Sequence, residues 1–204
     1  MPRMYIISGC NGAGKTTASY DILPRMFSCS QFVNSDEFAK GLSPFNPASA
    51  SVTASRLMLL RTRMLIETRK DFCIETTLAT RSLIRTIDEA HRNGYSVMVL
   101  YLWITSPELA IERVHARVMA GGHHIDDATV RRRYWTGLHY LFREYMPVCD
   151  RWMIADNTTA PFRTVAEGSK EDGVRISDPE TFSKIQGMHT DYEKKLIQED
   201  KKKR

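Results

Sequence analysis

Eight consecutive residues near the N-terminus constrain this chain more than any other feature. Residues 9–16 read Gly-Cys-Asn-Gly-Ala-Gly-Lys-Thr, which matches the pattern GxxxxGK[ST]. In such a loop the backbone N–H groups curl around phosphate oxygens, Lys15 neutralises the phosphates and the Thr16 hydroxyl ligates Mg²⁺. A β-rich apolar stretch, residues 4–8, precedes the loop, and a helical pattern, residues 15–27, follows it. The segment therefore predicts a phosphate-binding loop between a strand and a helix, with ATP or GTP and Mg²⁺ as ligands.

The predicted nucleotide site consists of this loop and the residue that follows it. We expect the phosphates to contact Gly9, Asn11, Gly12, Ala13, Gly14, Lys15, Thr16 and Thr17, with Thr16 as the metal ligand. The GxGxxG pattern of dinucleotide folds does not fit, because residues 9–14 read Gly-x-x-Gly-x-Gly and lead directly into Lys-Thr. A nicotinamide cofactor is therefore not expected.

Strand-like and helix-like segments alternate along most of the chain. Apolar or β-rich runs predict strands at residues 4–8, 31–34, 72–77, 96–104 and 151–156. Helical spacing lies between them, at residues 15–27, 51–70, 82–92, 106–119 and 127–145. This alternation predicts an α/β fold of the P-loop NTPase type, with a parallel sheet of about five strands and helices on both faces.

The 204 residues are expected to form one kinase-like core, residues 1–160, followed by a C-terminal extension, residues 161–204. A helical lid is expected around residues 106–145, with glycine hinges at Gly121 and Gly122. In the extension, residues 163–176 predict a hairpin and residues 178–195 a charged helix. The basic residues 201–204 are expected to be a solvated helix end.

Composition excludes several other classes of protein. The longest apolar run, residues 97–104, is far shorter than the roughly 20 residues that cross a bilayer, so no membrane association is expected. The N-terminus leads almost at once into the loop, which leaves no room for a secretory signal, and we expect a cytoplasmic protein. The four cysteines form no CxxC pair and are expected to be reduced thiols.

Phosphoryl transfer to a hydroxyl requires a carboxylate that accepts the proton, and Asp36 is the candidate. It lies just past the second predicted strand, at the sheet edge that carries the phosphate loop. The alternative is that Asp36 or Ser35 only caps a helical turn. Glu75 and Thr77 end the third strand at the same edge and could bind an acceptor, unless Glu75 is simply solvent-facing.

Arginines on the predicted lid helices are candidates for stabilising the transferred phosphoryl group. Arg113 and Arg117 lie four residues apart on one helix, and the run 131–133 can contribute another cation. The alternative is that Glu108 and Glu112 pair with these arginines in solvent. The apolar strand at residues 97–104 ends without an aspartate, which disfavours a nucleotide-dependent switch with its metal-binding carboxylate there.

Taken together, these segments resemble the zeta-toxin-like family of P-loop kinases, as a stand-alone member. The matching pieces are Asn11-Gly-Ala-Gly-Lys-Thr, Asn34-Ser-Asp-Glu-Phe-Ala, Gly41-Leu-Ser-Pro-Phe-Asn-Pro, Glu75-Thr-Thr-Leu, Ile111-Glu-Arg-Val and Gly121-Gly-His. The resemblance extends from about Met4 to Asn157. It implies a kinase in which Asp36 is the base and Lys15, Arg113 and Arg117 stabilise the phosphoryl group.

The resemblance also bears on the acceptor and on partners. Toxin members of the family phosphorylate UDP-N-acetylglucosamine and carry the acceptor pattern Glu-x-Thr-x-Arg. Here Glu75 and Thr77 fit, Ala79 replaces the arginine, and Arg81 follows two residues later as a candidate substrate contact. An antitoxin protein is a partner of such toxins, and a single chain does not specify it.

The sequence therefore predicts an ATP- and Mg²⁺-dependent small-molecule kinase. The alternatives are a nucleotide-dependent switch or ATPase that phosphorylates no acceptor, and a nucleic-acid kinase that stacks bases on Trp103, Trp135 or Trp152. The last alternative is weakened because the net charge of +5 is not organised into an evident basic patch.

Overall fold

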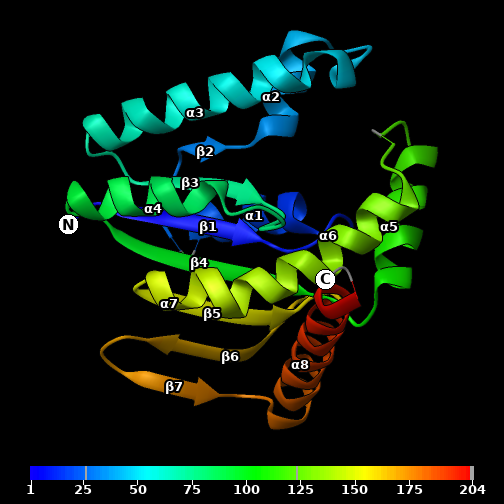
Figure 1. Cartoon of the computed structure of the whole chain (residues 1–204). Coiled ribbons are helices and arrows are strands. Elements are labelled where there is room, and N and C mark those ends of the chain that lie inside the picture. The colour runs from blue at the N-terminus through cyan, green and yellow to red at the C-terminus, as the bar shows by residue number, and fades with distance from the viewer. Residues whose placement is uncertain (26, 123, 203–204) are drawn as a thin grey trace.

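A seven-stranded mixed sheet forms the centre of the computed structural model, which describes residues 1–25, 27–122 and 124–202 (Figure 1). Its strands are β1 (Arg3–Ser8), β2 (Phe32–Val33), β3 (Phe72–Thr76), β4 (Ser96–Trp103), β5 (Arg151–Asp156), β6 (Arg163–Ser169) and β7 (Gly173–Ile176), in the spatial order β2-β3-β1-β4-β5-β6-β7. The first five strands in this order are parallel, as predicted. The predicted count of about five was too low, because β6 pairs antiparallel with β5 and the hairpin extends the same sheet.

The helices cover both faces of the parallel strands. They are α1 (Lys15–Arg25), α2 (Ser35–Leu42), α3 (Ser51–Glu67), α4 (Ser82–Arg92), α5 (Pro107–Met119), α6 (Asp127–Tyr140), α7 (Met146–Val148) and α8 (Pro179–Lys202), with a short 3₁₀ turn η1 (Pro47–Ala50) and a π-helical turn η2 (Leu141–Tyr145). The pattern at residues 127–145 predicts one continuous helix, and the structure changes to π-helical geometry at Leu141. Every helix in the described part of the chain is too short or too polar to span a membrane.

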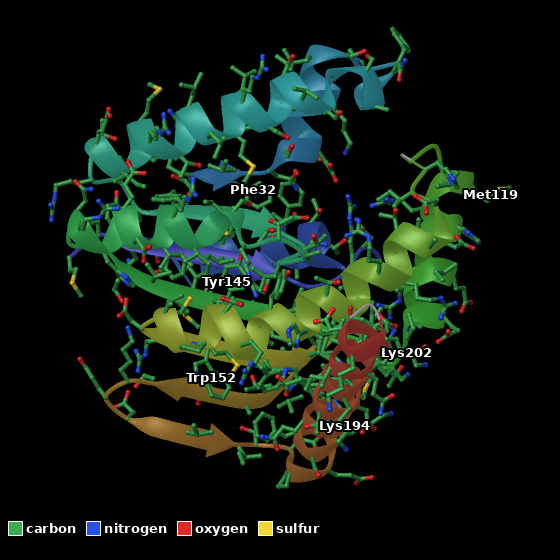
Figure 2. All side chains as sticks on the ribbon, viewed as in Figure 1. Phe32, Met119, Tyr145, Trp152, Lys194 and Lys202 are labelled. Carbon is green, nitrogen blue, oxygen red and sulfur yellow. The ribbon has the colours of Figure 1, made fainter. Side chains whose placement is uncertain are left out.

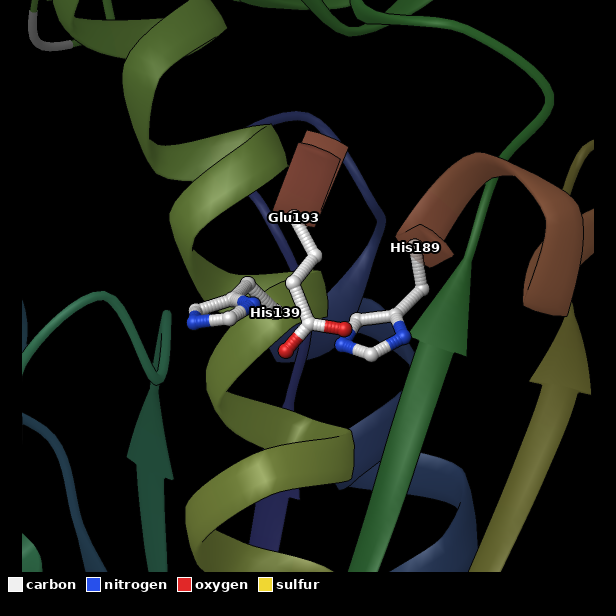
Figure 3. Close-up of side chains that lie close together, drawn as sticks. All are labelled: His139, His189 and Glu193. Carbon is white, nitrogen blue, oxygen red and sulfur yellow. The ribbon is translucent and has the colours of Figure 1, made fainter. Parts of the chain in front are cut away.

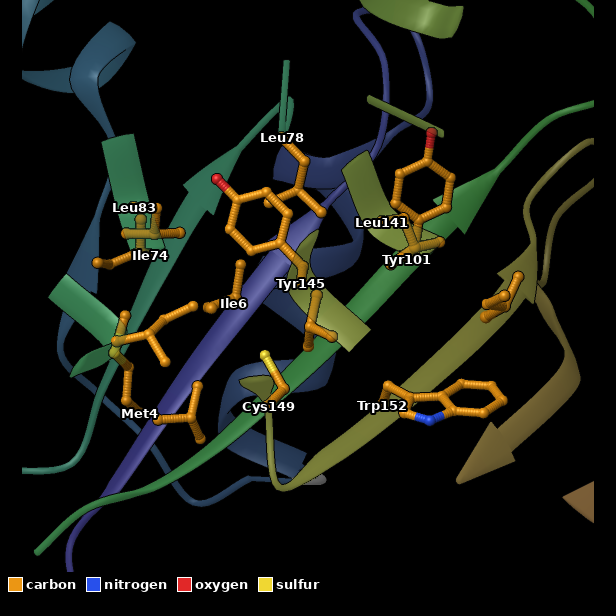
Figure 4. Close-up of a cluster of buried hydrophobic side chains, with 14 of the residues drawn as sticks. Met4, Ile6, Ile74, Leu78, Leu83, Tyr101, Leu141, Tyr145, Cys149 and Trp152 are labelled. Atoms are coloured by element: carbon orange, nitrogen blue, oxygen red, sulfur yellow. The ribbon is translucent and has the colours of Figure 1, made fainter. Parts of the chain in front are cut away.

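The central strands are buried on both faces, which explains their nearly continuous apolar sequence. Along β1, Met4 and Ile6 point into one core, while Tyr5 and Ile7 point into the other. The first core lies beneath α4, α6 and η2, and Tyr145 at its centre is fully buried between Leu78 and the strands (Figure 4). The second core lies beneath α1 and α5. The two-residue period of a strand therefore builds both layers from the same segments.

The C-terminal hairpin and helix pack against the rest of the chain. Phe182 and Ile185 at the start of α8 are buried in the same core as β1 and β4. Lys194 and Lys202, labelled on the same helix in Figure 2, are exposed to solvent. All four cysteines are free and buried.

Replacing Ile185 by alanine tests how strongly α8 contributes to folding. The side chain is fully buried, so its truncation leaves a cavity and should lower the free energy of unfolding by about 2–4 kcal/mol. Ile197→Ala, on the exposed face of the same helix, should change it by less than about 0.5 kcal/mol. Urea unfolding followed by circular dichroism measures both, and equal effects would contradict the packing of α8 on the core.

Candidate active site

The phosphate-binding loop runs from the carboxyl end of β1 to the start of α1. Gly12 and Gly14 have φ values of +80° and +82°, a conformation that side chains with a Cβ rarely adopt. A Cβ at Gly12 would also lie 2.4 Å from the carbonyl oxygen of Ala110 on α5. Glycine is therefore required at Gly12 by both its backbone conformation and the close approach of a neighbouring helix.

Side chains from α5 and from the residue after β5 hold this loop in place. Arg113 on α5 donates to the carbonyl oxygens of Gly12 (3.4 Å), Asn157 (3.0 Å) and Thr158 (2.7 Å). Asn157, which follows β5, donates from Nδ2 to the carbonyl oxygen of Ala13 at 2.7 Å. Arg113 thus contacts the loop through backbone carbonyl groups, and the alternative pairing with Glu112 is not what the structure shows.

Glu75 is the centre of a buried polar network beside the loop. Its Oε2 accepts hydrogen bonds from Thr16 Oγ1 at 2.9 Å and from Asn34 Nδ2 at 2.8 Å. Its Oε1 lies 4.0 Å from Lys15 Nζ, and Lys15 also donates to the carbonyl oxygen of Cys10. Both charged side chains of this pair are less than 10% exposed. The glutamate predicted to contact an acceptor therefore contacts the predicted metal ligand, Thr16.

The strand order explains why Glu75 reaches this position. Strand β3 lies next to β1, with Glu75 in register with Ile7 and Thr76 in register with Ser8 at the end of β1. Glu75 thus provides, at the end of β3, the strand-end carboxylate that residues 97–104 lack. The sequence signal was the placement of Glu75 at the end of a short buried strand, but the sequence did not indicate which strand adjoins the loop.

Asn34 links the same network to α2. Its side-chain oxygen accepts from the backbone N–H groups of Asp36 (2.7 Å) and Glu37 (3.4 Å), so Asn34 is the N-cap, and neither Ser35 nor Asp36 has that role. The Asp36 carboxylate is exposed, and among the described residues it has no hydrogen-bond or ion-pair partner. Its charge nevertheless raises the pKa of Glu75, although burial is the largest cause of that shift. Asp36 therefore lies close to the loop network with its carboxylate available.

A cleft of about 690 Å³ opens beside Thr16 and Asp36. Its walls include the segment 44–48, Arg117 at the end of α5, and Gly121 and Gly122. The predicted lid segment thus faces the predicted base across the cleft, with His123 of the family pattern lying outside the described residues. The volume falls within the range of small-molecule sites.

A second arginine reaches the loop from α6. Arg133 donates from Nη1 to Oδ1 of Asn11 at 3.1 Å. Burial lowers the pKa of Arg133, as does Arg132, while the negative charge of Asp36 raises it. Arg131 of the same run instead forms an ion pair with Glu108. Of the run 131–133, Arg133 is therefore the residue that contacts the phosphate loop.

The two remaining candidates for binding substrate, Arg81 and Thr77, do not line the Asp36 cleft. Arg81 forms an ion pair with Glu144 at 2.7 Å, and its guanidinium lies over the Tyr140 ring. It lines a separate cavity of about 520 Å³ between α3 and α4. Thr77 is half-buried, and its carbonyl oxygen is approached closely by Gly137 of α6. The structure therefore does not bring Arg81 to the Asp36 cleft as a substitute for the arginine that Ala79 replaces.

The glycine loop, the sheet order and the flanking helices define the fold of P-loop kinases. The family model described as zeta toxin matches residues 1–134, and the chain belongs to this family. A Haemophilus influenzae protein described as uncharacterized is 33% identical over 129 residues, which cover 62% of this chain and 88% of that protein.

Solved structures share the fold at low sequence identity. The PezAT chromosomal toxin–antitoxin system of Streptococcus pneumoniae has a matching chain with a TM-score of 0.62 at 15% identity, covering 97% of this chain and 88% of that one. AvrRxo1-ORF1:-ORF2 with ATP has a TM-score of 0.70 at 15% identity, covering 91% of this chain and 63% of that one. These similarities show the fold.

Replacing Glu75 by glutamine should make stability less dependent on pH. Burial raises the pKa of Glu75 above its ordinary value of 4.5, while Lys15, Thr16 and Asn34 oppose the shift. Above pH 4.5 the folded chain therefore binds more protons than the unfolded chain, and the free energy of unfolding falls as pH rises towards the folded-state pKa. Glu75→Gln removes this fall, so its stability relative to the unmodified protein should increase with pH.

Urea unfolding of the ligand-free protein at a series of pH values measures this difference. Glu67→Gln, an exposed glutamate on α3, is the matched control and should follow the unmodified protein at every pH. Parallel curves for Glu75→Gln and the unmodified protein would contradict the proposed cost of burying this carboxylate.

Proposed function

We propose that this chain is an ATP- and Mg²⁺-dependent kinase that transfers the γ-phosphoryl group to a hydroxyl of a small molecule. The supporting observation is the junction of Thr16, Glu75 and Asn34, which joins the phosphate loop to the helix that carries Asp36. The proposed nucleotide site, metal ligands and base thereby lie beside the same cleft, the one that opens next to Thr16 and Asp36. Zeta toxin family membership and a neighbour solved with ATP support the same reaction.

Lys15 and the loop N–H groups are assigned to the phosphates of the nucleotide. Thr16 and Glu75 would hold Mg²⁺, since a hydroxyl and a carboxylate 2.9 Å apart form the hard oxygen donor set that this ion prefers. When bound, Mg²⁺ neutralises negative charge on the β- and γ-phosphates. Asn34, by donating to the same carboxylate oxygen, orients Glu75 towards Thr16.

Asp36 is assigned as the general base. It accepts the proton of the acceptor hydroxyl as that oxygen bonds to the γ-phosphorus, and the bond from the γ-phosphorus to the bridging oxygen breaks to release the nucleoside diphosphate. Arg133 and Arg117 are assigned to the charge on the moving phosphoryl group. Arg113 is also assigned to this charge, through the electrostatic attraction of its guanidinium group. It holds the loop through the carbonyl groups that it contacts.

The acceptor is assigned to the cleft beside Asp36. We infer that the acceptor is UDP-N-acetylglucosamine or another nucleotide sugar or metabolite, and Ala79, where the toxins carry arginine, does not line this cleft. A nucleic-acid acceptor is less well supported, since Trp103 and Trp152 are buried and Trp135 stacks on Tyr192. The PezAT neighbour belongs to a toxin–antitoxin system, which supports an antitoxin-type protein as a partner.

Replacing Asp36 by asparagine should lower the rate of phosphoryl transfer by about 10²- to 10⁴-fold, because the base is lost while shape is kept. The measurement is transfer of labelled γ-phosphate from ATP with Mg²⁺ to UDP-N-acetylglucosamine, other nucleotide sugars, nucleosides and oligonucleotides. Asp88→Asn, an exposed aspartate on α4, should retain full activity. Full activity of Asp36→Asn would remove the base from this position, and slow phosphate release to water alone would favour the ATPase alternative.

Replacing Arg133 by glutamine should lower transfer by about 10²-fold, as expected when one preorganised donor to the transition state is removed. Arg132→Gln is the matched control, since Arg132 is exposed on the same helix. The thermal shift produced by ATP, measured alongside, separates loss of chemistry from loss of nucleotide binding. Equal rates for the two variants would exclude Arg133 from the reaction.

A further inference from the structure

A cluster of metal-binding side chains lies where α6 meets α8, and none of its members lines the Asp36 cleft. It consists of His139 on α6 and of His189 and Glu193 on α8 (Figure 3). One potential ligand atom from each of the three residues lies within 4.8 Å of the others. The three residues come from the core and from the C-terminal helix, so a cation bound by all of them would join these two parts of the chain.

The helical geometry presents the three groups to one point. His189 and Glu193 are four residues apart on α8, so their side chains lie on the same face, one turn apart. In Figure 3 the Glu193 carboxylate lies between the two imidazole rings. The rings of His139 and His189 are nearly parallel, with centroids 5.4 Å apart and an interplanar angle of 19°.

The two histidines have nitrogens that the surrounding protein does not satisfy. His139 Nδ1 and His189 Nε2 are shielded from solvent and have no hydrogen-bond partner among the described residues. Buried polar atoms are almost always paired, so two such atoms in adjacent rings need an explanation. An unprotonated imidazole nitrogen is also a strong ligand for transition metals.

Two charged groups, Glu193 and Arg143, lie beside the two imidazole rings. Burial lowers the pKa of both histidines, while the carboxylate of Glu193 opposes that shift. Arg143 lowers the pKa of both rings as well, and its Nε lies 3.2 Å from Oε1 of Glu193. The other carboxylate oxygen, Oε2, is the one that we assign to a cation.

We propose that His139, His189 and Glu193 bind one Zn²⁺ ion and thereby fix the C-terminal half of α8 on α6. Two imidazoles and a carboxylate form a ligand set that suits Zn²⁺, with water in the fourth position, whereas Mg²⁺ and Ca²⁺ prefer oxygen ligands alone. The first half of α8 is already anchored by Phe182 and Ile185. The metal would anchor the half beyond His189, where most side chains are exposed.

The test is a Zn²⁺ titration of metal-free, full-length protein in competition with a chromophoric chelator. One ion per chain should bind, and His139→Gln, His189→Gln and Glu193→Gln should each weaken binding by at least about tenfold, since losing even a hydrogen-bond partner of a ligand typically costs that much. His115→Gln, a histidine on α5, is the matched control and should bind as the unmodified protein does. Hydrogen exchange of residues 186–200 should slow on addition of Zn²⁺ in the unmodified protein and the control only.

Two results would overturn the proposal. One is the absence of a bound ion in the unmodified protein under these conditions, and the other is unchanged affinity in His139→Gln and His189→Gln, which would place the ion elsewhere. Circular dichroism of the metal-free variants checks that they fold. If the histidine variants do not fold, Glu193→Gln keeps the proposal testable, because glutamine preserves the shape of the glutamate side chain.

Discussion

The carboxylate of Glu75 is buried against the phosphate loop, and the arrangement of the candidate site depends on how its charge is compensated. Removing a carboxylate from water is costly unless donors or cations surround it. Here Thr16 and Asn34 donate hydrogen bonds and Lys15 lies at ion-pair distance. Burial still raises the pKa of Glu75, which means that the charged carboxylate destabilises the ligand-free protein. A bound cation would reduce that cost, which ties the stability of the site to its proposed function.

Asn34 connects the Glu75 network to the helix that carries the proposed base, Asp36. Its side chain donates to Glu75 and accepts from the first N–H groups of α2, so one residue both completes the buried network and begins the helix. Because Asn34 provides the cap, Asp36 is not needed for that purpose, and its carboxylate faces the cleft. A short hydrogen-bonded connection therefore joins the phosphate loop to the helix that carries Asp36, and it would preorganise the proposed nucleotide site and the proposed base.

The opposite side of the loop is held by groups from α5, α6 and the end of β5. Arg113, Asn157 and Arg133 contact three different residues of the loop. Within the loop, the N–H of Ala13 donates to the carbonyl oxygen of Cys10. The three surrounding side chains bind carbonyl oxygens of the loop or the Asn11 side chain, and none of them occupies a loop N–H group that is proposed to bind phosphate.

The sequence by itself determined the phosphate loop, the parallel α/β core and the family resemblance, because these depend on residues that are adjacent or regularly spaced. Gly12, Lys15 and Thr16 have fixed spacing, and the period of apolar residues marks a strand buried on both faces. The tertiary structure alone decided that Glu75 meets Thr16, that Arg133 reaches Asn11, and that Arg81 lies in another cavity. It also decided that the hairpin joins the sheet and that His139 meets α8. The physical reason is that such contacts depend on strand order and helix packing, which are set by the burial of the whole core and are not encoded in any one segment.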